Sequence, residues 1–277
     1  MGVTRSADAR LPAAAERQVI WHDLECGGYK ADLALWRELA DGSHDGSPAD
    51  PILEVGAGSG RVALDLAGAG HRVTALDLDR RLLDALSARA AGGEVEVVCA
   101  DARTFDLSRR DFGLCLVPMQ TVQLLGGEAG RAAFLRRVRS HLRPGGVLAC
   151  AIVSDFESFD VTRGGDGPPP DVVRLGAVDY VSRPIRVSTS EDRVVIERVR
   201  RVLPGGRELP REGSNRLLRL GARAATTAGE RDVIELDLVT AEQLTREGIA
   251  AGLRPGVARR VEGTDDYLGS DVVMLHA

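Results

Sequence analysis

Short apolar runs alternate with longer segments of helical periodicity in the first half of the chain. Five runs are predicted to be strands, at residues 51–55, 72–77, 95–100, 112–117 and 146–153. Helical patterns at 61–69, 80–91 and 128–142 lie between them. The runs are apolar throughout, as in parallel strands that are buried on both faces. We therefore expect an α/β fold with a mostly parallel sheet and helices on both faces.

The pattern changes after the fifth predicted strand. Residues 163–171 are rich in glycine and proline, which excludes a helix or a central strand and indicates a linker. Polar and apolar residues then alternate over 178–203 and 231–239, as in antiparallel strands with one face in water. Arginines dominate the wet face, which is interpreted either as a solvated surface or as a contact for an anionic group.

The two ends of the chain carry further patterns. Residues 1–17 are polar and small, and we expect a tail there. Apolar residues recur at helical spacing from Val19 to Ala40, with Gly27-Gly28 as a predicted break. Near the C-terminus the sequence predicts an N-cap at Thr240, a helix over 241–252, and strands near 256–262 and 271–276.

Composition narrows the class of partner. The chain has 277 residues and a net charge of −5, so nothing draws it as a whole to nucleic acid or to an anionic membrane. The four cysteines form no C-x-x-C pair and no zinc spacing, which fits a reduced compartment. We see no signal peptide and no run of apolar residues long enough to span a membrane, so a cytoplasmic location is expected.

A glycine-rich loop follows the first predicted strand, with the sequence Glu54-Val55-Gly56-Ala57-Gly58-Ser59-Gly60. Glycine permits positive φ and lets the backbone approach a ligand closely, and the next helix offers unpaired N–H groups. A dinucleotide-binding loop reads G-x-G-x-x-G, whereas here the third glycine comes one residue early and Arg61 takes its place.

Two acidic residues end the neighbouring strands. Asp77 ends the second strand, where a carboxylate can accept hydrogen bonds from both hydroxyls of a ribose. Asp101 ends the third strand and is placed to accept from an exocyclic adenine amine. The sequence 142-LRPGG-146 predicts a sharp turn into the fifth strand. Each feature is common by itself, but their order and spacing together are not.

With these motifs the chain resembles class I S-adenosylmethionine (AdoMet)-dependent methyltransferases of the small-molecule, natural-product type. The resemblance covers about 50–155 strongly and 241–277 more weakly. It implies a Rossmann-like, seven-stranded, mostly parallel sheet. It also implies a set of cofactor-binding residues: Tyr29, Glu54, Gly56, Ala57, Gly58, Gly60, Asp77, Leu78, Asp101, Ala102, Val117 and Pro118.

The resemblance also suggests how the chain is divided. We expect a tail and lid helices at 1–45, an AdoMet-binding core at 46–155, an antiparallel insertion that roofs the acceptor at 156–239, and completion of the core at 240–277. Metal-dependent O-methyltransferases need a carboxylate cluster, whereas the fourth strand here ends in Pro118-Met119-Gln120. No metal is therefore expected.

The segment 21–36 resembles the lid helices of small-molecule methyltransferases, with Tyr29 near the sulfonium. His22, Glu25 and Tyr29 share one face if a single helix continues through them. We predict that His22 acts as a base, that Glu25 orients it and that Tyr29 completes the network; an amphipathic surface helix is the alternative. The acceptor is expected to contact Trp21, Met119, Gln120 and Gln123.

The predicted function is methyl transfer to a small molecule, at nitrogen, oxygen or an electron-rich carbon such as an indole carbon, in bacterial secondary metabolism. An NAD(P)-dependent oxidoreductase, a macromolecular methyltransferase and an AdoMet-binding protein with another role stay open as alternatives. The sequence leaves both a monomer and a homodimer open.

Overall fold

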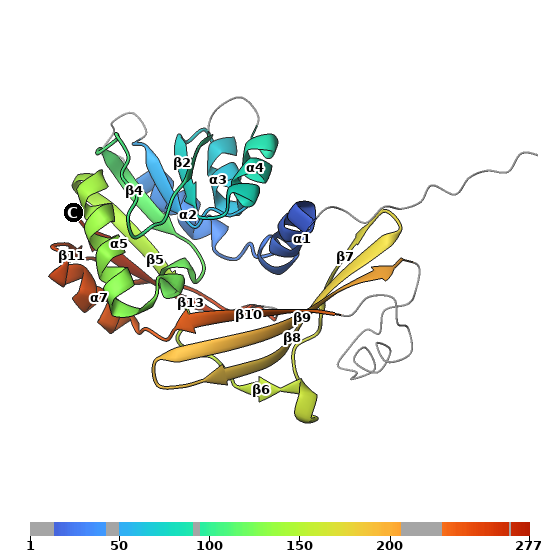
Figure 1. The fold of residues 1–277 in the computed structure, drawn as a ribbon. Coiled ribbons are helices and arrows are strands. Elements are labelled where there is room, and N and C mark those ends of the chain that lie inside the picture. Colours follow the sequence, from blue (N-terminus) through green and yellow to red (C-terminus); the bar gives the residue numbers. More distant parts are fainter. Residues whose placement is uncertain (1–13, 43–49, 91–94, 206–228, 266) are drawn as a thin grey trace, which may run out of the picture.

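The computed structural model describes residues 14–42, 50–90, 95–205, 229–265 and 267–277. Figure 1 shows a central sheet flanked by helices and a second sheet of long strands beside it, with helix α1 between the two. In the described parts of the chain, no helix is long and apolar enough to cross a membrane.

The central sheet is mostly parallel. Its described strands are β1 (Ile52–Val55), β2 (Val73–Asp77), β3 (Val95–Cys99), β4 (Phe112–Val117), β5 (Leu142–Ile152), β11 (Arg254–Pro255), β12 (Arg259–Val261) and β13 (Ser270–His276). They run in the order β11-β13-β5-β4-β1-β2-β3, and β12 also pairs with β13. Only β11, β12 and β13 pair antiparallel. Since β11 and β12 pair with different parts of β13, these eight strands fill seven positions in the sheet. The predicted α/β fold with a mostly parallel, seven-stranded sheet is confirmed.

Helices cover both faces of this sheet. The helices α3 (Arg61–Gly68) and α4 (Arg80–Arg89) pack on one face, and α5 (Gly127–His141) and α7 (Ala241–Ala250) pack on the other. The central strands β1 and β4 are buried on both sides because alternate residues point to opposite faces, so Ile52 belongs to one core cluster and Leu53 to the other. The edge strand β3 is only partly buried, which differs from the expectation for this run. Thr240 caps α7 in a capping box with Gln243, as predicted.

Two details differ from the expectations, the start of the first helix and the stretch 142–146. Helix α1 (Ala14–Cys26) begins inside the expected tail. The break after α1 was expected, and α2 (Leu33–Gly42) follows it. Residues 142–146 make no turn before the fifth strand but belong to β5 as an irregular stretch. Phe112 pairs with Leu142 whereas Leu114 pairs with Val147, so the register shifts where Gly145 takes a φ of 75°.

The second sheet is antiparallel and follows β5 in sequence. It contains β6 (Phe159–Asp160), β7 (Asp171–Leu175), β8 (Val178–Thr189), β9 (Arg193–Pro204) and β10 (Glu230–Asp237). The order is β10-β9-β8-β6, with β7 on another part of β8. Short 3-10 turns, η1 (Thr121–Leu124) and η2 (Val161–Arg163), follow β4 and β6. Contacts of β10 and β5 with η1, and of α1 with β8, join this sheet to the core.

Candidate active site

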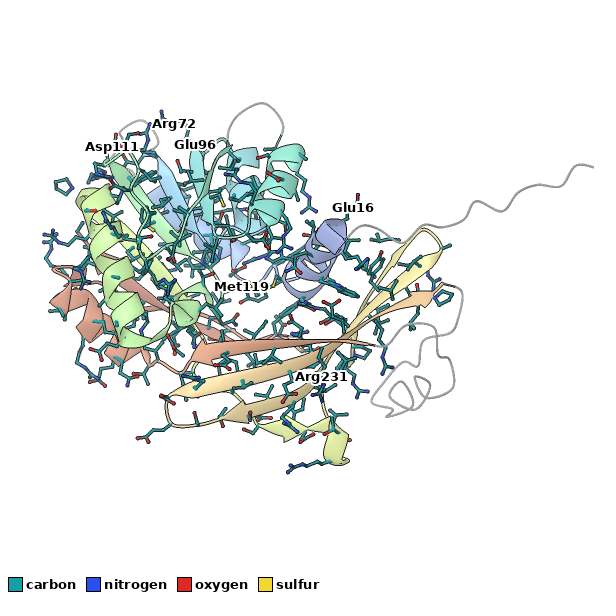
Figure 2. All side chains as sticks on the ribbon, viewed as in Figure 1. Glu16, Arg72, Glu96, Asp111, Met119 and Arg231 are labelled. Carbon is teal, nitrogen blue, oxygen red and sulfur yellow. The ribbon has the colours of Figure 1, made fainter. Side chains whose placement is uncertain are left out.

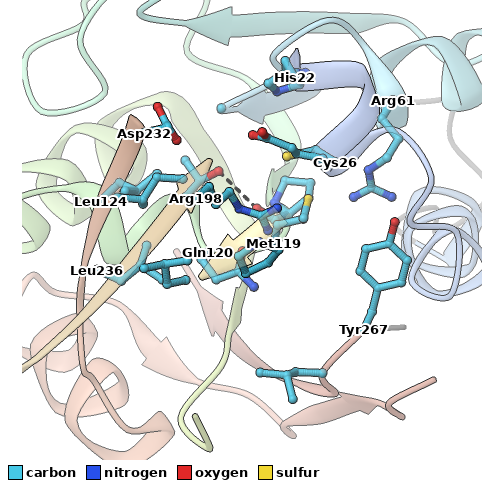
Figure 3. A pocket seen from close by; sticks show the side chains of 18 of the residues that line it. His22, Cys26, Arg61, Met119, Gln120, Leu124, Arg198, Asp232, Leu236 and Tyr267 are labelled. Atoms are coloured by element: carbon cyan, nitrogen blue, oxygen red, sulfur yellow. Dashed lines mark hydrogen bonds between the residues drawn. The ribbon is translucent and has the colours of Figure 1, made fainter. Parts of the chain in front are cut away.

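A cavity of about 1250 Å³ lies between the core and the antiparallel sheet (Figure 3). Its core wall is formed where strands β1 to β4 end, from Gly56, Leu78, Asp101 and Pro118. Ligands of open α/β sheets bind at this edge. A site for one drug-sized ligand usually measures roughly 300–1,000 Å³, so this cavity has room for a cofactor and a second molecule.

The glycine loop is packed tightly beneath η1 and α1. Gly56 and Gly58 have φ values of 77° and 55°. A Cβ added at Gly56 would lie 2.4 Å from the Thr121 side chain, and one at Gly58 would lie 2.4 Å from the His22 ring. The loop therefore excludes side chains at both positions for steric reasons as well as conformational ones.

Asp77 is held in place by the backbone around it. Its carboxylate accepts hydrogen bonds from the N–H groups of Gly58 and Asp79, each at 2.8 Å. Asp101 accepts from the backbone and side chain of Arg103, and this guanidinium lowers the pKa of Asp101. Leu78 is 69% exposed beside Asp77. The structure thus brings both predicted acids and the predicted adenine-contacting leucine to one wall of the cavity.

Glu54 lines the cavity although its side chain is almost fully buried. Burial raises the pKa of Glu54 to about 8, against the attraction of Arg61. Its Oε2 has no hydrogen-bond partner among the described residues. A buried carboxyl oxygen without a donor fits a ligand that carries an ammonium group, as the methionine end of AdoMet does.

The three predicted catalytic residues do not form one network. Helix α1 ends at Cys26, so Tyr29 does not share a helical face with His22 and Glu25. The carboxylate of Glu25 accepts two hydrogen bonds of 2.7 Å from Arg200 and one of 2.6 Å from Ser182. Tyr29 is buried against the ring of Tyr267, 5.0 Å away. The helical premise of the predicted network was wrong, because the glycine pair ends the helix first.

His22 has partners that the sequence analysis missed. Its Nδ1 lies 3.1 Å from Ser59 Oγ, and the Ser59 hydroxyl donates to Asp23 at 2.5 Å. Since the single Ser59 proton is used by Asp23, Ser59 accepts from His22 Nδ1–H, and Nε2 keeps its lone pair. Burial lowers the pKa of His22, so its neutral form is favoured. Arg89 also pairs with Asp23, which ties α1 to α4.

Six predicted site residues do not line the cavity: Trp21, Tyr29, Gly58, Gly60, Val117 and Gln123. Gln123 is fully buried; its amide nitrogen donates to the carbonyls of Val153 and Asp237, and its oxygen accepts from Val153 N–H. Trp21 packs edge-on against Tyr180 at 5.2 Å, and Val117 is in the core. The structure thus does not bring the side chains of Gln123, Trp21 and Val117 to the cavity.

Met119 and Gln120, which are expected to contact the acceptor, line the cavity. Figure 2 shows Met119 between the two sheets, just past β4. Its φ of 55° is the one positive value of a non-glycine residue among the described residues. Strained backbone of this kind is often kept at functional sites.

Other lining residues could not be predicted individually. Arg61 pairs with Asp32 at 2.6 Å and donates to the Tyr29 carbonyl at 2.9 Å. These contacts join the segment between α1 and α2 to the end of the glycine loop. The antiparallel sheet contributes Arg198, Arg200 and Asp232. Among the described residues no group of three or more His, Cys, Asp or Glu side chains is placed to hold a metal ion.

Residues 52–146 match a family model described as a methyltransferase domain. These residues form a methyltransferase domain. The match confirms the resemblance drawn from the glycine loop and the two acids, and the domain supplies the core wall of the cavity.

The methyltransferase domain also has curated relatives. The cypemycin N-terminal methyltransferase of a Streptomyces species is 34% identical over 131 residues, which cover 46% of this chain and 51% of that enzyme. The chain thus spans about half the length of this curated relative.

Solved methyltransferases share the fold over nearly the whole chain. One is AdoMet-bound CalS10, an amino pentose methyltransferase from Micromonospora echinaspora, with a TM-score of 0.64, 23% identity, and coverage of 93% of this chain and 96% of that one. Another is the sugar N-methyltransferase KedS8 from a Streptoalloteichus species, with a TM-score of 0.64, 20% identity, and coverage of 99% and 97%. The likeness extends to helices α1 and α2 and to the antiparallel sheet, because these elements lie within the covered length.

Proposed function

We propose that the chain binds AdoMet in the cavity and transfers its methyl group to an amine nitrogen of a small natural-product molecule. One observation carries the proposal. Glu54, Asp77 and Asp101 come from three strand ends and line one wall of a cavity that is large enough for a second ligand beneath the antiparallel sheet. Nitrogen is favoured because the cypemycin enzyme and KedS8 are named for N-terminal and sugar N-methylation.

In this proposal each cofactor residue has a separate task. Asp77 accepts hydrogen bonds from the ribose hydroxyls, Asp101 accepts one from the adenine amine, and Glu54 pairs with the methionine ammonium. Leu78 and Ala102 lie against the adenine, while Gly56 and Ala57, which line the cavity, border the ligand with their backbone. Pro118 and Met119 border the methionine end.

AdoMet, when bound, supplies a methyl group that is already activated on a sulfonium. The chain then has to align the acceptor, exclude water and take up a proton from the nitrogen. We assign proton uptake to His22 Nε2, with Ser59 and Asp23 as positioning residues that hold the required tautomer. Glu25 joins the lid to the roof through Arg200 instead of orienting His22.

The test is incubation of the purified chain with AdoMet and matched amine and alcohol acceptors, followed by mass spectrometry. The expected result is S-adenosylhomocysteine together with an amine that has gained the mass of one methylene, and less product with Asp77→Asn at an AdoMet concentration that does not saturate the variant. Methylation of the alcohols alone would contradict the choice of nitrogen. Binding of NAD(H) in place of AdoMet would contradict the function as a whole.

A further inference from the structure

The face of the antiparallel sheet that lines the cavity has a polar half and an apolar half. In the strand register, Asp232 pairs with Arg198, and Arg198 with Pro184. The next cavity-facing rung joins Ile234, Ile196 and Val187. A register shift between Pro184 and Arg186 in β8 places both Pro184 and Val187 on this face.

The polar half holds more carboxylates than guanidinium groups. Arg200, which is 8% exposed, donates to both oxygens of Glu25 and, at 2.9 Å, to Asp232 Oδ1. Arg198 donates to Asp171 at 3.1 Å. Three carboxylates thus face two guanidinium groups, and both arginines are already paired. This arrangement does not favour an anionic ligand such as a diphosphate.

One polar atom of this half has no partner. Asp232 Oδ2 is buried and accepts no hydrogen bond within the described part of the chain. Burial also raises the pKa of Asp232, against the attraction of Arg200. A buried carboxylate oxygen of this kind is stabilised by a donor, and most strongly by a cationic one. Figure 3 shows the Asp232 carboxylate beside the open part of the pocket, with Arg198 nearby.

The apolar half offers a continuous surface next to this carboxylate. Ile196, Ile234, Leu236 and Val187 line the cavity together with Phe156 and Phe159. These side chains belong to one hydrophobic cluster, so the surface is backed by packed residues and does not depend on a single side chain.

We propose that Asp232 recognises a cationic amine on the acceptor and that the Ile196–Ile234–Leu236 surface holds an apolar body joined to it. This inference rests on the proposed function for the identity of the ligand as a methyl acceptor. It assigns Asp232 to recognition and gives it no part in the methyl transfer step. The two halves of the roof then select amphiphilic amines over nucleotide-linked or wholly polar ones.

The test uses dansylcadaverine, an amine on an apolar fluorophore, and its N-acetyl derivative, which lacks the charge. Binding is measured by fluorescence titration in saturating S-adenosylhomocysteine. We expect the amine to bind about tenfold more tightly than the acetylated probe, the order expected for one charge-assisted hydrogen bond. Asp232→Asn should abolish this preference and leave the affinity for the acetylated probe unchanged.

Matched controls come from the opposite face of the same strand. Glu235 is exposed and pairs with Arg193, so Glu235→Gln should preserve the preference for the amine. Ile234→Ser should weaken the binding of both probes, whereas Val233→Ser should weaken neither, because Val233 is 54% exposed. Thermal unfolding of each variant separates loss of fold from loss of recognition.

Three results would overturn the inference: equal affinity for the two probes, no binding of either, or a charge preference that persists in Asp232→Asn. Failure of the unsubstituted chain to bind S-adenosylhomocysteine is a separate outcome, which overturns the proposed function. The two failures are therefore distinguishable in the same set of titrations.

Discussion

Replacing Gly58 with alanine tests how helix α1 packs on the glycine loop. Gly58 has a φ of 55°, and an added Cβ would lie 2.4 Å from both Cε1 and Nε2 of His22. The left-handed backbone costs a non-glycine residue roughly 1–2 kcal/mol. Overpacking against the ring costs typically about 1–3 kcal/mol more, because Ser59 holds His22 in place.

Gly70→Ala is the matched control. Gly70 has a φ of 93°, further from the region that L-residues tolerate, but no atom lies within 4 Å of its added Cβ. It therefore shows the backbone cost without a clash. We expect Gly58→Ala to lower the free energy of unfolding by about 2–5 kcal/mol in urea titrations, and Gly70→Ala by about 1–2 kcal/mol.

The clash has its own readouts. Gly58→Ala should also weaken the binding of S-adenosylhomocysteine in calorimetry, because helix α1 has to move off the glycine loop, whereas Gly70→Ala should not. In the His22→Ala background, Gly58→Ala should cost only the backbone part, about 1–2 kcal/mol. The same cost of Gly58→Ala with and without the His22 ring would refute the contact between His22 and the loop.

Three other predictions follow from single side chains. Between its ordinary pKa of about 4.5 and its folded value of about 8, Glu54 is protonated in the folded chain and ionised in the unfolded one. The free energy of unfolding of the ligand-free chain should therefore fall as pH rises through this window, by at most about 1.4 kcal/mol per pH unit from this group. Urea titrations at several pH values measure this dependence, and Glu54→Gln should make it flatter. Asp77→Asn should weaken the binding of S-adenosylhomocysteine at least about tenfold in calorimetry, since a charge-assisted hydrogen bond is worth about 1.5–3 kcal/mol. Unchanged affinity would exclude the role of Asp77 in binding the ribose. Gln123→Ala should lower the melting temperature because it leaves buried backbone groups unpaired. Gln120→Ala should leave the melting temperature unchanged and raise the KM for the acceptor. The reverse pattern would contradict the placement of Gln123 in the interior and of Gln120 at the cavity.

The sequence determined the core of the fold and the wall of the site that the core supplies. Parallel strands buried on both faces are apolar along their whole length, so β1 and β4 could be located from local composition. The run that forms β3 was located in the same way, although β3 is a partly exposed edge strand. Asp77 and Asp101 could be placed for a related reason, since residues at the carboxyl ends of parallel strands meet at one edge of the sheet.

Tertiary structure alone decided which polar side chains line the cavity and which are paired inside the protein. Gln123 lies just past a strand that ends at the cavity, but backbone groups of Val153 and Asp237 take up its amide. Glu25 is paired with Arg200, 175 residues away, and His22 with Ser59, 37 residues away. On the antiparallel sheet, a register shift in β8 likewise places both Pro184 and Val187 on the cavity face. Hydrogen-bond partners and strand register are set by contacts between distant segments, and no local pattern of residues encodes them.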